Sequence, residues 1–456
     1  MSQHNRLLII GLDGATFDVL DSLRTTCEIP TLSWLLDQSA RGVLDSTRPI
    51  ATLPAWTTFL TTASPSYHGI TDIFLRLPFH DAVEPASGLR RSAPTWLLEL
   101  AKSGARVGAF GFPGPYPAEE HPNLTQISGF DTPDAKASGR GVSPARHQRT
   151  IDELGGWHFS LLPEDRKEGL EPDLCAEVLV EDFHIKTRIV RELHQQECFD
   201  VLAWHIQPSD TIAHHAWASW DRMSPRARAY PATNAFEKVF EAIDASLGKL
   251  LSDVEPTHIM VVSDHGFGGA GDQAFYVNRW LATQGVLEFS KANGVTESLT
   301  KRVFGIAQNL KSRYPKLTKK IWSTLATHLP PSVFSGIRGQ NKTHPSTQAF
   351  SDEFDYAPSI WISRRSHFSF GILSDEDADA LQERLAERLR QLKHPAGHLL
   401  FDHVWLRPKD GPHRERLPDI VLEPAFIEGY RTSFLSSPGP GPCFIELEPN
   451  ELRAGR

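Results

Sequence analysis

The sequence predicts an α/β protein with a mostly parallel central sheet and helices on both faces. Three short apolar runs support this prediction: 7–10, 201–206 and 259–262 each end at a polar cluster. Apolar runs of this length are typical of buried parallel strands. An amphipathic stretch lies between the second and third runs, and a strand, a crossover helix and a second strand favour a parallel sheet.

The first strand and the helix after it can be placed from local signals. The run 7–10 ends at Gly11-Leu12-Asp13-Gly14, which puts a carboxylate at the edge of the sheet. Pro30 then opens a helix, and Gly42 is placed to stop it. Its inward-facing residues are Leu32, Leu35 and Leu36.

The two later strands repeat this arrangement of an apolar run followed by polar residues. Residues 201–206 lead into Asp210 and His214, and residues 259–262 lead into Asp264 and His265. The helix between them presents one apolar face, made of Phe236, Val239, Phe240, Ile243, Leu247 and Leu250. Because ligands of open parallel sheets bind beyond the carboxyl ends of the strands, the polar clusters mark a candidate site.

Further signals occur towards the C-terminus. Ser374 and Asp377 have the spacing of a capping box and precede a helix with an apolar face. That face consists of Leu381, Leu385, Leu389 and Leu392. Residues 418–422 then predict a further strand.

One segment differs in composition from the rest. Residues 276–345 hold eleven Lys and Arg against two Glu, a local excess of +9 in a chain whose net charge is −9. We interpret 276–345 as a basic helical insertion, and 1–275 with 346–456 as the catalytic core. The insertion is either a solvated surface element or a lid that attracts an anionic substrate.

Bulk composition excludes several classes of protein. The acidic net charge argues against binding to nucleic acid polymers or anionic membranes, and no segment has the roughly 18 apolar residues of a membrane helix. The N-terminus lacks the pattern of a signal peptide, and the four cysteines form no paired framework. We therefore expect a cytoplasmic protein with free thiols.

The polar clusters have the residue types of a metal site. Asp13, Asp264 and His265 follow two different strands, and Gly266 allows a turn that lets the adjacent Asp and His face one ion. Asp210 and His214 are spaced to share one face of a helical turn. Carboxylate plus imidazole favours zinc or manganese. Any one of these residues alone is usually a helix cap or a hydrogen-bonded core residue, but their recurrence at successive strand ends favours a metal site.

The chain resembles the type I phosphodiesterase and nucleotide pyrophosphatase branch of the alkaline phosphatase superfamily. The resemblance rests on blocks that occur in order along nearly the whole chain. They are residues 8–14, 52–60, 68–70, 128–133, 210–214, 262–268, 278–281 and 418–421. It implies an alkaline-phosphatase-like three-layer αβα sandwich with a helical insertion.

The resemblance also implies roles for individual residues. Thr52 corresponds to the nucleophile, and one ion is held by Asp13, Thr52, Asp264 and His265. A second ion is held by Asp210, His214 and a third histidine near the C-terminus. Thr52 would attack phosphorus in line, and water would then release the phosphothreonine. Thr57 and Thr58 are rival nucleophiles, but they would lie a turn or more into the helix.

Two positions depart from the family pattern. The segment in which the third histidine is expected reads Ser436-Ser437-Pro438-Gly439-Pro440, and no histidine follows His413. Histidines that are candidates to complete the second site in space are His205, His215, His367 and His403. Nucleotide pyrophosphatases often carry an asparagine shortly after the nucleophile, where this chain has Ala55.

These observations leave three functional hypotheses. The first is a metal-dependent hydrolase of phosphodiesters, pyrophosphates or monoesters, with Zn²⁺ or Mn²⁺ and a small anionic substrate such as a nucleotide. The second is a transferase that moves a phosphoryl or sulfuryl-type group to an organic acceptor, because incomplete ligation of the second ion would impair water activation. The third is a member that binds an anion without turnover.

Overall fold

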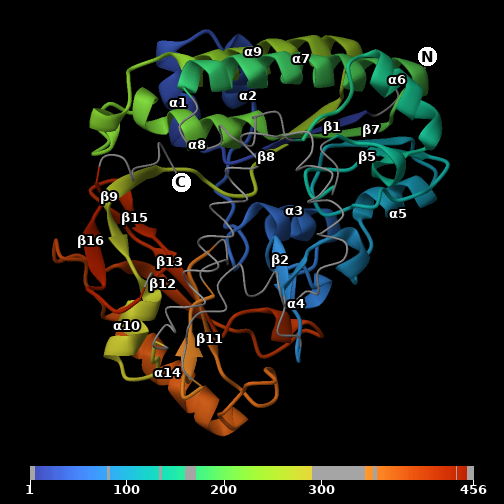
Figure 1. Ribbon diagram of the computed structural model, residues 1–456. Helices are drawn as coiled ribbons and strands as arrows, with labels where there is room; N and C mark the ends of the chain where they lie inside the picture. The colour runs from blue at the N-terminus through green and yellow to red at the C-terminus, as the bar shows by residue number, and fades with distance from the viewer. Residues whose placement is uncertain are drawn as a thin grey trace, which may run out of the picture.

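The structure is a computed structural model that describes residues 6–79, 83–132, 136–159, 171–289, 345–352, 357–437 and 439–448. It consists of a large lobe built on a six-stranded sheet and a small lobe built from two four-stranded sheets (Figure 1). The large lobe contains the three strands expected from the apolar runs. The small lobe is formed by residues after position 268.

The sheet of the large lobe is mostly parallel, as predicted. Its spatial order is β6-β5-β4-β7-β1-β8, and only β6 runs antiparallel to its neighbour. The strands are β1 (Leu7–Leu12), β4 (Val107–Phe110), β5 (Leu124–Ile127), β6 (Val142–Ser143), β7 (Val201–Ile206) and β8 (His258–Val262).

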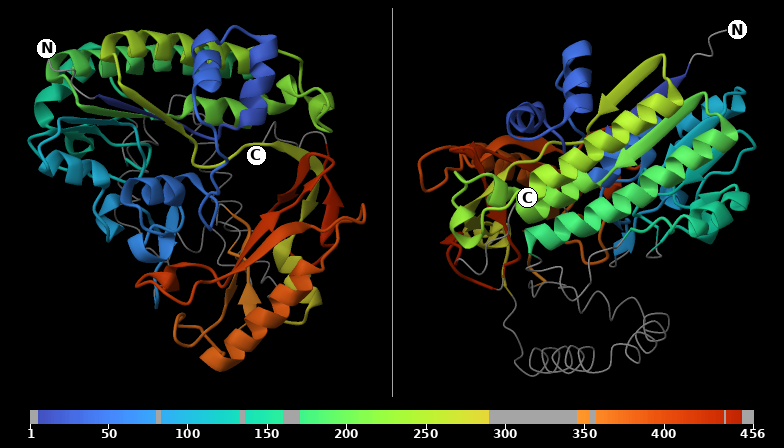
Figure 2. Two further views of the ribbon diagram at one scale, coloured as in Figure 1. Left: turned by 180° about the vertical axis from the view of Figure 1, so that it is seen from behind. Right: turned by 90° about the horizontal axis from the view of Figure 1, so that it is seen from above.

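Helices cover both faces of this sheet and make three layers (Figure 1). One face carries α1 (Phe17–Thr26), α2 (Pro30–Gln38), α7 (Pro172–Glu197), α8 (Pro208–Trp220) and α9 (Ala235–Val254). The other face carries α3 (Thr52–Thr61) and α5 (Trp96–Lys102). Figure 2 shows the long helices α7 and α9 lying side by side over the first face.

The side chains of β1 show how this strand joins the two cores. Leu8 and Ile10 belong to the core beneath α7 and α9, whereas Ile9 packs with Trp56 of α3 on the opposite face. Successive side chains of a strand point to opposite faces, so a strand buried on both sides must be apolar throughout. The αβα sandwich predicted from the sequence is therefore confirmed.

The strand order explains why the site forms where it does. β1 lies between β7 and β8, with Leu12 opposite Ile206 and Gly11 opposite Val262. The crossover from β7 to β8 through α8 and α9 thus spans β1. Because all three strands run parallel, the residues that follow them meet at one edge of the sheet.

The small lobe has its own apolar core and two sheets, with strand orders β10-β11-β13-β12 and β14-β15-β9-β16. Its strands are β9 (Gly269–Phe275), β10 (Ala349–Phe350), β11 (Ser359–Ile362), β12 (Phe401–Leu406), β13 (Ile420–Pro424), β14 (Phe426–Ile427), β15 (Tyr430–Phe434) and β16 (Phe444–Glu446). Its helices are α10 (Val277–Thr283) and α14 (Asp375–Arg390).

Two sequence predictions concern the small lobe. The capping box is confirmed, because the Asp377 backbone N–H donates to Ser374 Oγ over 3.1 Å at the start of α14. Of the segment interpreted as a basic insertion, residues 276–289 begin with α10 and contribute to the core of the small lobe. Its remainder, 290–344, lies outside the described residues.

The remaining elements of the fold are short. They are α4 (Pro65–His68), α6 (Gln148–Glu153), β2 (Phe74–Arg76), β3 (Val83–Pro85) and the 3-10 turns Gly88–Arg90, Gly139–Gly141, Ala145–His147, Ala227–Ala229 and Arg414–Arg416. Among the helices that the structure describes, none has both the length and the apolarity needed to cross a membrane.

Candidate active site

Asp13 follows directly after β1 and is held on several sides. Its backbone N–H donates to the carbonyl of Ile206 over 3.1 Å, and its own carbonyl accepts from Ser209 Oγ over 2.7 Å. Its side chain is buried, and His205 Nε2 on the neighbouring strand β7 donates to Asp13 Oδ2 over 2.8 Å. The carboxylate is thereby fixed with its second oxygen, Oδ1, free to bind a ligand.

Asp264 and His265 lie past the end of β8, where the chain leaves the sheet. The Gly14 N–H lies 3.4 Å from Asp264 Oδ1, and Ser46 Oγ donates to the Asp264 carbonyl over 2.6 Å. His265 Nδ1 donates to the Gly266 carbonyl over 2.8 Å. Because Nδ1 carries the proton in this bond, Nε2 keeps its lone pair, which is the form of histidine that ligates metals.

Thr52 is the first residue of α3, after the extended residue Ala51. Its hydroxyl donates to His265 Nε2 over 3.0 Å. The same nitrogen lies 3.4 Å from Asp13 Oδ1 and 3.4 Å from Asp264 Oδ2. The structure therefore brings together Asp13, Thr52, Asp264 and His265, the four residues predicted for the first ion.

The rival nucleophiles Thr57 and Thr58 are engaged elsewhere. The buried Thr57 hydroxyl donates to the Leu53 carbonyl one turn back in α3, over 2.7 Å. Thr58 Oγ1 is hydrogen-bonded to His68 Nε2 over 2.9 Å. Both hydroxyls therefore have structural partners, and Thr52 is the threonine of α3 that faces the acidic cluster.

Asp210 and His214 lie on α8, one turn apart, with His214 Nε2 3.4 Å from Asp210 Oδ2. The predicted shared face is thus present. Asp210 also borders the first cluster, because a Cβ built on Gly14 would lie 3.1 Å from Asp210 Oδ1. Glycine at this position, with a φ of +66°, lets the loop after β1 approach α8 closely.

The four histidines considered as a third ligand of the second site lie in different places. His205 bonds Asp13, and His215 follows His214 on α8. His367 stacks on Trp361 in the small lobe, and His403 lies on β12 beside Trp405. Among the described residues, the one group of three or more His, Cys, Asp or Glu ligand atoms within 4.8 Å of one another is that of Asp13, Asp264 and His265.

A comparison with protein families matches most of the chain. The family model for type I phosphodiesterase / nucleotide pyrophosphatase matches residues 7–427. The chain belongs to this family. Family membership makes the protein a hydrolase of the phosphodiesterase and pyrophosphatase type, within the alkaline phosphatase superfamily.

Solved structures resemble this phosphodiesterase-family chain in fold. Phosphonoacetate hydrolase from Sinorhizobium meliloti 1021, in complex with phosphonoformate, aligns with a TM-score of 0.56 and 14% identity over 99% of this chain and 88% of that chain. Its complex with phosphonoacetate gives 0.55 and 14% over 95% and 83%. Murine ectonucleotide pyrophosphatase / phosphodiesterase 5 gives 0.44 and 11% over 98% and 86%. A comparison with curated proteins found no match.

The acidic cluster of this phosphodiesterase-family site has the properties of a cation site. Asp13 Oδ1 and Asp264 Oδ2 are buried and have no hydrogen-bond partner within the described part of the chain. Burial and the Asp13 and Asp210 carboxylates raise the pKa of Asp264 well above its usual range. Burial also acts to raise the pKa of Asp13, but the hydrogen bond from His205, with further electrostatic effects of His205 and His265, outweighs it and lowers that pKa. Buried like charges with unpaired oxygens fit a divalent cation.

Some supporting residues of the site were not identified as such from the sequence. Ser46, Ser209 and His205 hold the backbone or side chains of the two aspartates. One signal for His205 lies in strand register, since it pairs with Gly11, two residues before Asp13. The serines carry no comparable signal, because Ser46 lies in a loop far from Asp264 in the sequence.

Proposed function

We propose that the protein is a metal-dependent hydrolase of small phosphate esters that works through a covalent intermediate on Thr52. The observation that carries this proposal is the convergence of the Thr52 hydroxyl with Asp13, Asp264 and His265, with two buried carboxylate oxygens unpaired. Candidate substrates are phosphodiesters, pyrophosphates and monoesters, nucleotides included. The four free cysteines support a reducing compartment, and we propose the cytoplasm.

The proposed ligands of the first ion are Asp13, Thr52, Asp264 and His265, and we favour Zn²⁺ because two carboxylates and an imidazole suit it. When bound, this ion would supply positive charge that favours the alkoxide of Thr52 and offsets the charge of the phosphoryl oxygens. Asp210 and His214 are the proposed protein ligands of a second ion.

The protein's own groups prepare the attack. His265 Nε2 and the α3 terminus hold Thr52 Oγ1 facing the acidic cluster. The first turn of a helix has N–H groups without intrahelical acceptors, and these favour phosphoryl oxygens nearby. Thr52 Oγ would form a bond to phosphorus while the bond to the leaving oxygen breaks, and water would then hydrolyse the phosphothreonine.

The test is a comparison of wild-type protein with Thr52→Ala and Thr58→Val, each loaded with Zn²⁺. The substrates are bis(4-nitrophenyl) phosphate and 4-nitrophenyl phosphate. We expect Thr52→Ala to lose on the order of 10³-fold in kcat/KM, because it removes the nucleophile. Thr58→Val removes a hydroxyl that bonds His68 and helps to hold α3, so it should lower kcat/KM far less than Thr52→Ala, on the order of 10-fold. Equal activity of Thr52→Ala and wild type would refute the mechanism.

Within the described residues, Asp210 and His214 belong to no group of three or more His, Cys, Asp or Glu ligand atoms, and this favours group transfer as the second candidate. Incomplete ligation would weaken the activation of water more than the attack by Thr52. Acid-quenched protein analysed by mass spectrometry separates the alternatives. A phosphothreonine adduct that decays in water supports hydrolysis, and one that decays only when an alcohol acceptor is added supports transfer. Anion binding without an adduct or turnover would indicate a non-catalytic member.

A further inference from the structure

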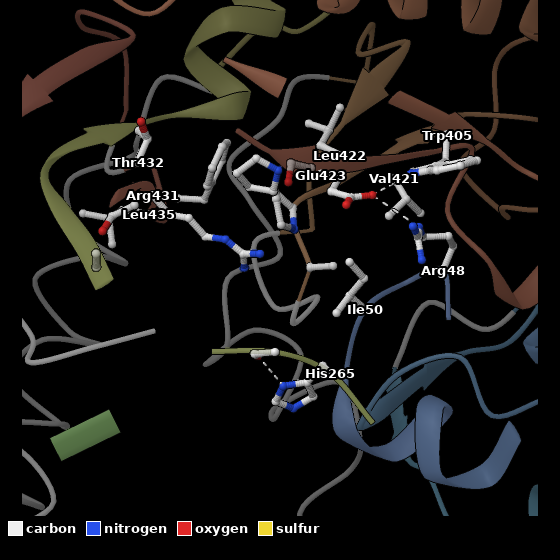
Figure 3. A pocket seen from close by; sticks show the side chains of 18 of the residues that line it. Arg48, Ile50, His265, Trp405, Val421, Leu422, Glu423, Arg431, Thr432 and Leu435 are labelled. Atoms are coloured by element: carbon white, nitrogen blue, oxygen red, sulfur yellow. Dashed lines mark hydrogen bonds and ion pairs between the residues drawn. The ribbon is translucent and has the colours of Figure 1, made fainter. Parts of the chain in front are cut away.

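A cavity of about 150 Å³ lies beside the candidate active site, between the two lobes. His265 and Ile50 line it from the large lobe, and Ile50 is two residues before Thr52. The small lobe contributes Glu423, Trp405 and Arg431 among others. Figure 3 shows Arg48 and Arg431 entering from opposite sides, with His265 at another end of the cavity.

Arg48 has a paired charge, although its buried Nε makes no hydrogen bond within the described part of the chain. Its Nε lies 3.3 Å from Glu423 Oε2, and its guanidinium carbon lies 4.7 Å from the centre of the Trp405 ring. Trp405 Nε1 donates to the same carboxylate oxygen over 2.9 Å. Arg48, Glu423 and Trp405 therefore form one wall of the cavity in which the positive charge is already paired.

Arg431, on β15, differs from Arg48 in its contacts. Its guanidinium carbon lies 4.6 Å from the centre of the Phe426 ring, yet its buried Nε has no hydrogen-bond partner in the described part of the protein. No carboxylate of the described residues forms an ion pair with it within 4.0 Å; Glu423 and Asp402 act on it from farther away. An arginine stays protonated at neutral pH even when buried, so this charge faces the cavity with unused donors.

The half-buried guanidinium of Arg431 has no ion pair within the described residues, so its charge is available to a ligand in the cavity. An anionic ligand in the cavity would provide the missing partner, and the planar guanidinium can donate two parallel hydrogen bonds to a carboxylate or a phosphoryl group. The cavity is several times larger than the roughly 30 Å³ that one water molecule occupies in the liquid. It can therefore hold a small charged group.

We propose that Arg431 binds a second anionic group of the substrate, a carboxylate or phosphoryl group, while the scissile phosphorus lies at Thr52. This inference rests on the proposed function, since it assigns the reacting group to the Thr52 end of the site. It names the substrate class as compact phosphate esters or anhydrides that carry a further negative group. Arg431 is in this sense a specificity-determining residue.

The test measures binding, so that it does not depend on turnover. Three non-hydrolysable probes are titrated calorimetrically into the Zn²⁺-loaded protein: methylphosphonate, 3-phosphonopropionate and methylenediphosphonate. The first has one anionic group, and the other two add a carboxylate or a second phosphonate. We expect wild type to bind at least one of the latter about 10-fold or more tightly than methylphosphonate, because charge-assisted paired hydrogen bonds add to affinity. The tighter probe identifies the second group.

Arg431→Met should reduce this preference to less than about twofold and leave methylphosphonate binding unchanged. Arg431→Lys keeps the charge but loses the paired donors, so its preference should lie between those of wild type and Arg431→Met. It replaces Arg431→Met in the test if that variant does not fold. Arg149→Met, at an exposed arginine on α6, is the matched control and should keep the wild-type preference. An unchanged preference in the Arg431 variants, or none in wild type, overturns the proposal.

The outcomes also separate this inference from the proposed function. If the preference depends on Arg431 but no substrate is turned over, the subsite stands and the catalytic proposal fails. If Thr52-dependent turnover occurs and Arg431→Met affects melting temperature alone, the catalytic proposal stands and Arg431 is structural.

Discussion

At the scale of single residues, the site depends on how its ligands are oriented before any ion arrives. Asp13 presents Oδ1 to the cluster because Oδ2 is occupied by His205 Nε2 at 2.8 Å. His205 itself is buried between Trp56 and Phe112, whose rings lie 5.1 and 5.6 Å from its own. The histidine therefore positions the aspartate rather than completing the second site.

The first prediction concerns this contact. His205→Leu should weaken Zn²⁺ binding about 10- to 100-fold, because loss of a hydrogen bond to a metal ligand typically has that effect. His205→Gln, whose side-chain amide can still donate near the Nε2 position, should recover part of the loss. Competition with a chromogenic chelator measures both affinities.

The control for this prediction is His403→Gln, an exposed histidine on β12. It should bind Zn²⁺ as wild type does. Equal affinities for His205→Leu and wild type would show that Asp13 does not need His205 for its orientation.

The residues that gather at the first cluster were predictable because each lies in a short motif at a strand or helix end. The convergence of Asp13, Asp264 and His265 follows from parallel strands that end at the same edge. The part played by His205 was not predictable, since it depends on which strands are neighbours. The sequence does not reveal that β7 pairs directly with β1 through Gly11 and His205.

At the scale of elements, α3 must be held so that Thr52 stays at the cluster. His68, at the end of α4, connects the two helices: its Nδ1 accepts from the Ile70 N–H over 3.1 Å, and its Nε2 bonds Thr58 Oγ1 over 2.9 Å. Burial lowers the pKa of His68 to about 3. The charge of Arg91 adds a smaller lowering effect, and a backbone hydrogen bond acts in the opposite direction. This contact therefore requires a neutral imidazole.

The second prediction concerns pH. In the unfolded chain His68 binds a proton near the ordinary histidine pKa of 6.5, whereas in the folded protein its pKa is about 3. Below pH 6.5 the unfolded state thus binds more protons, and stability falls with falling pH. At pH 5 the loss due to His68 is about 2 kcal/mol in the free energy of unfolding. Urea denaturation of wild type and His68→Gln at pH 7 and pH 5 measures it.

His68→Gln should lower stability at pH 7 but remove this part of the pH dependence. The quantity to compare is the change between the two pH values within each protein, because other histidines titrate in both. If that change is the same in wild type and variant, His68 is protonated in the fold and does not hold α3 in the proposed way.

Most elements of the large lobe were predictable from periodicity, but their ends were less so. α2 has the predicted buried Leu32, Leu35 and Leu36. It ends before Ser39, however, and not at Gly42. Arg41 Nε donates to the Leu36 carbonyl over 2.9 Å, so a side chain satisfies the end of the helix before the glycine is reached.

At the scale of the whole molecule, the two lobes have separate apolar cores, and the candidate site lies on the large lobe next to the small one. The αβα layers were predictable because buried strands and amphipathic helices leave strong periodic signals. In the small lobe α14 and β13 were also predictable, but the pairing of its strands was not, because short strands pair across long sequence separations, as β15 does with β9. The cavity that contains Arg431 depends on those pairings, so it had no signal in the sequence.

The last prediction concerns the coupling of metal binding to folding. Asp13 and Asp264 follow β1 and β8, which are far apart in the sequence, so the ligand set exists only in the folded protein. A ligand that binds only the folded state stabilises it, by about 2.7 kcal/mol at a free concentration 100 times Kd. Thermal melting of the wild type should therefore shift upward when Zn²⁺ is added to chelator-treated protein.

Asp264→Asn should change both the melting temperature of the metal-free protein and its increase on adding Zn²⁺. The pKa of Asp264 is higher in the folded protein than in the unfolded chain, so the folded state binds more protons. The stability of the metal-free protein therefore falls as the pH rises above the pKa that Asp264 has in the unfolded chain. A neutral asparagine removes that cost, and metal-free Asp264→Asn should melt at a higher temperature than metal-free wild type at pH 8. It should also gain little stability from Zn²⁺, because one ligand is lost.

The control is Asp173→Asn, in an exposed ion pair with Lys238, which should gain as much stability from Zn²⁺ as wild type. If Zn²⁺ stabilises Asp264→Asn as strongly as wild type, the ion binds elsewhere, since a site at Asp13 and Asp264 cannot tolerate the loss of one of its two carboxylates without weaker binding.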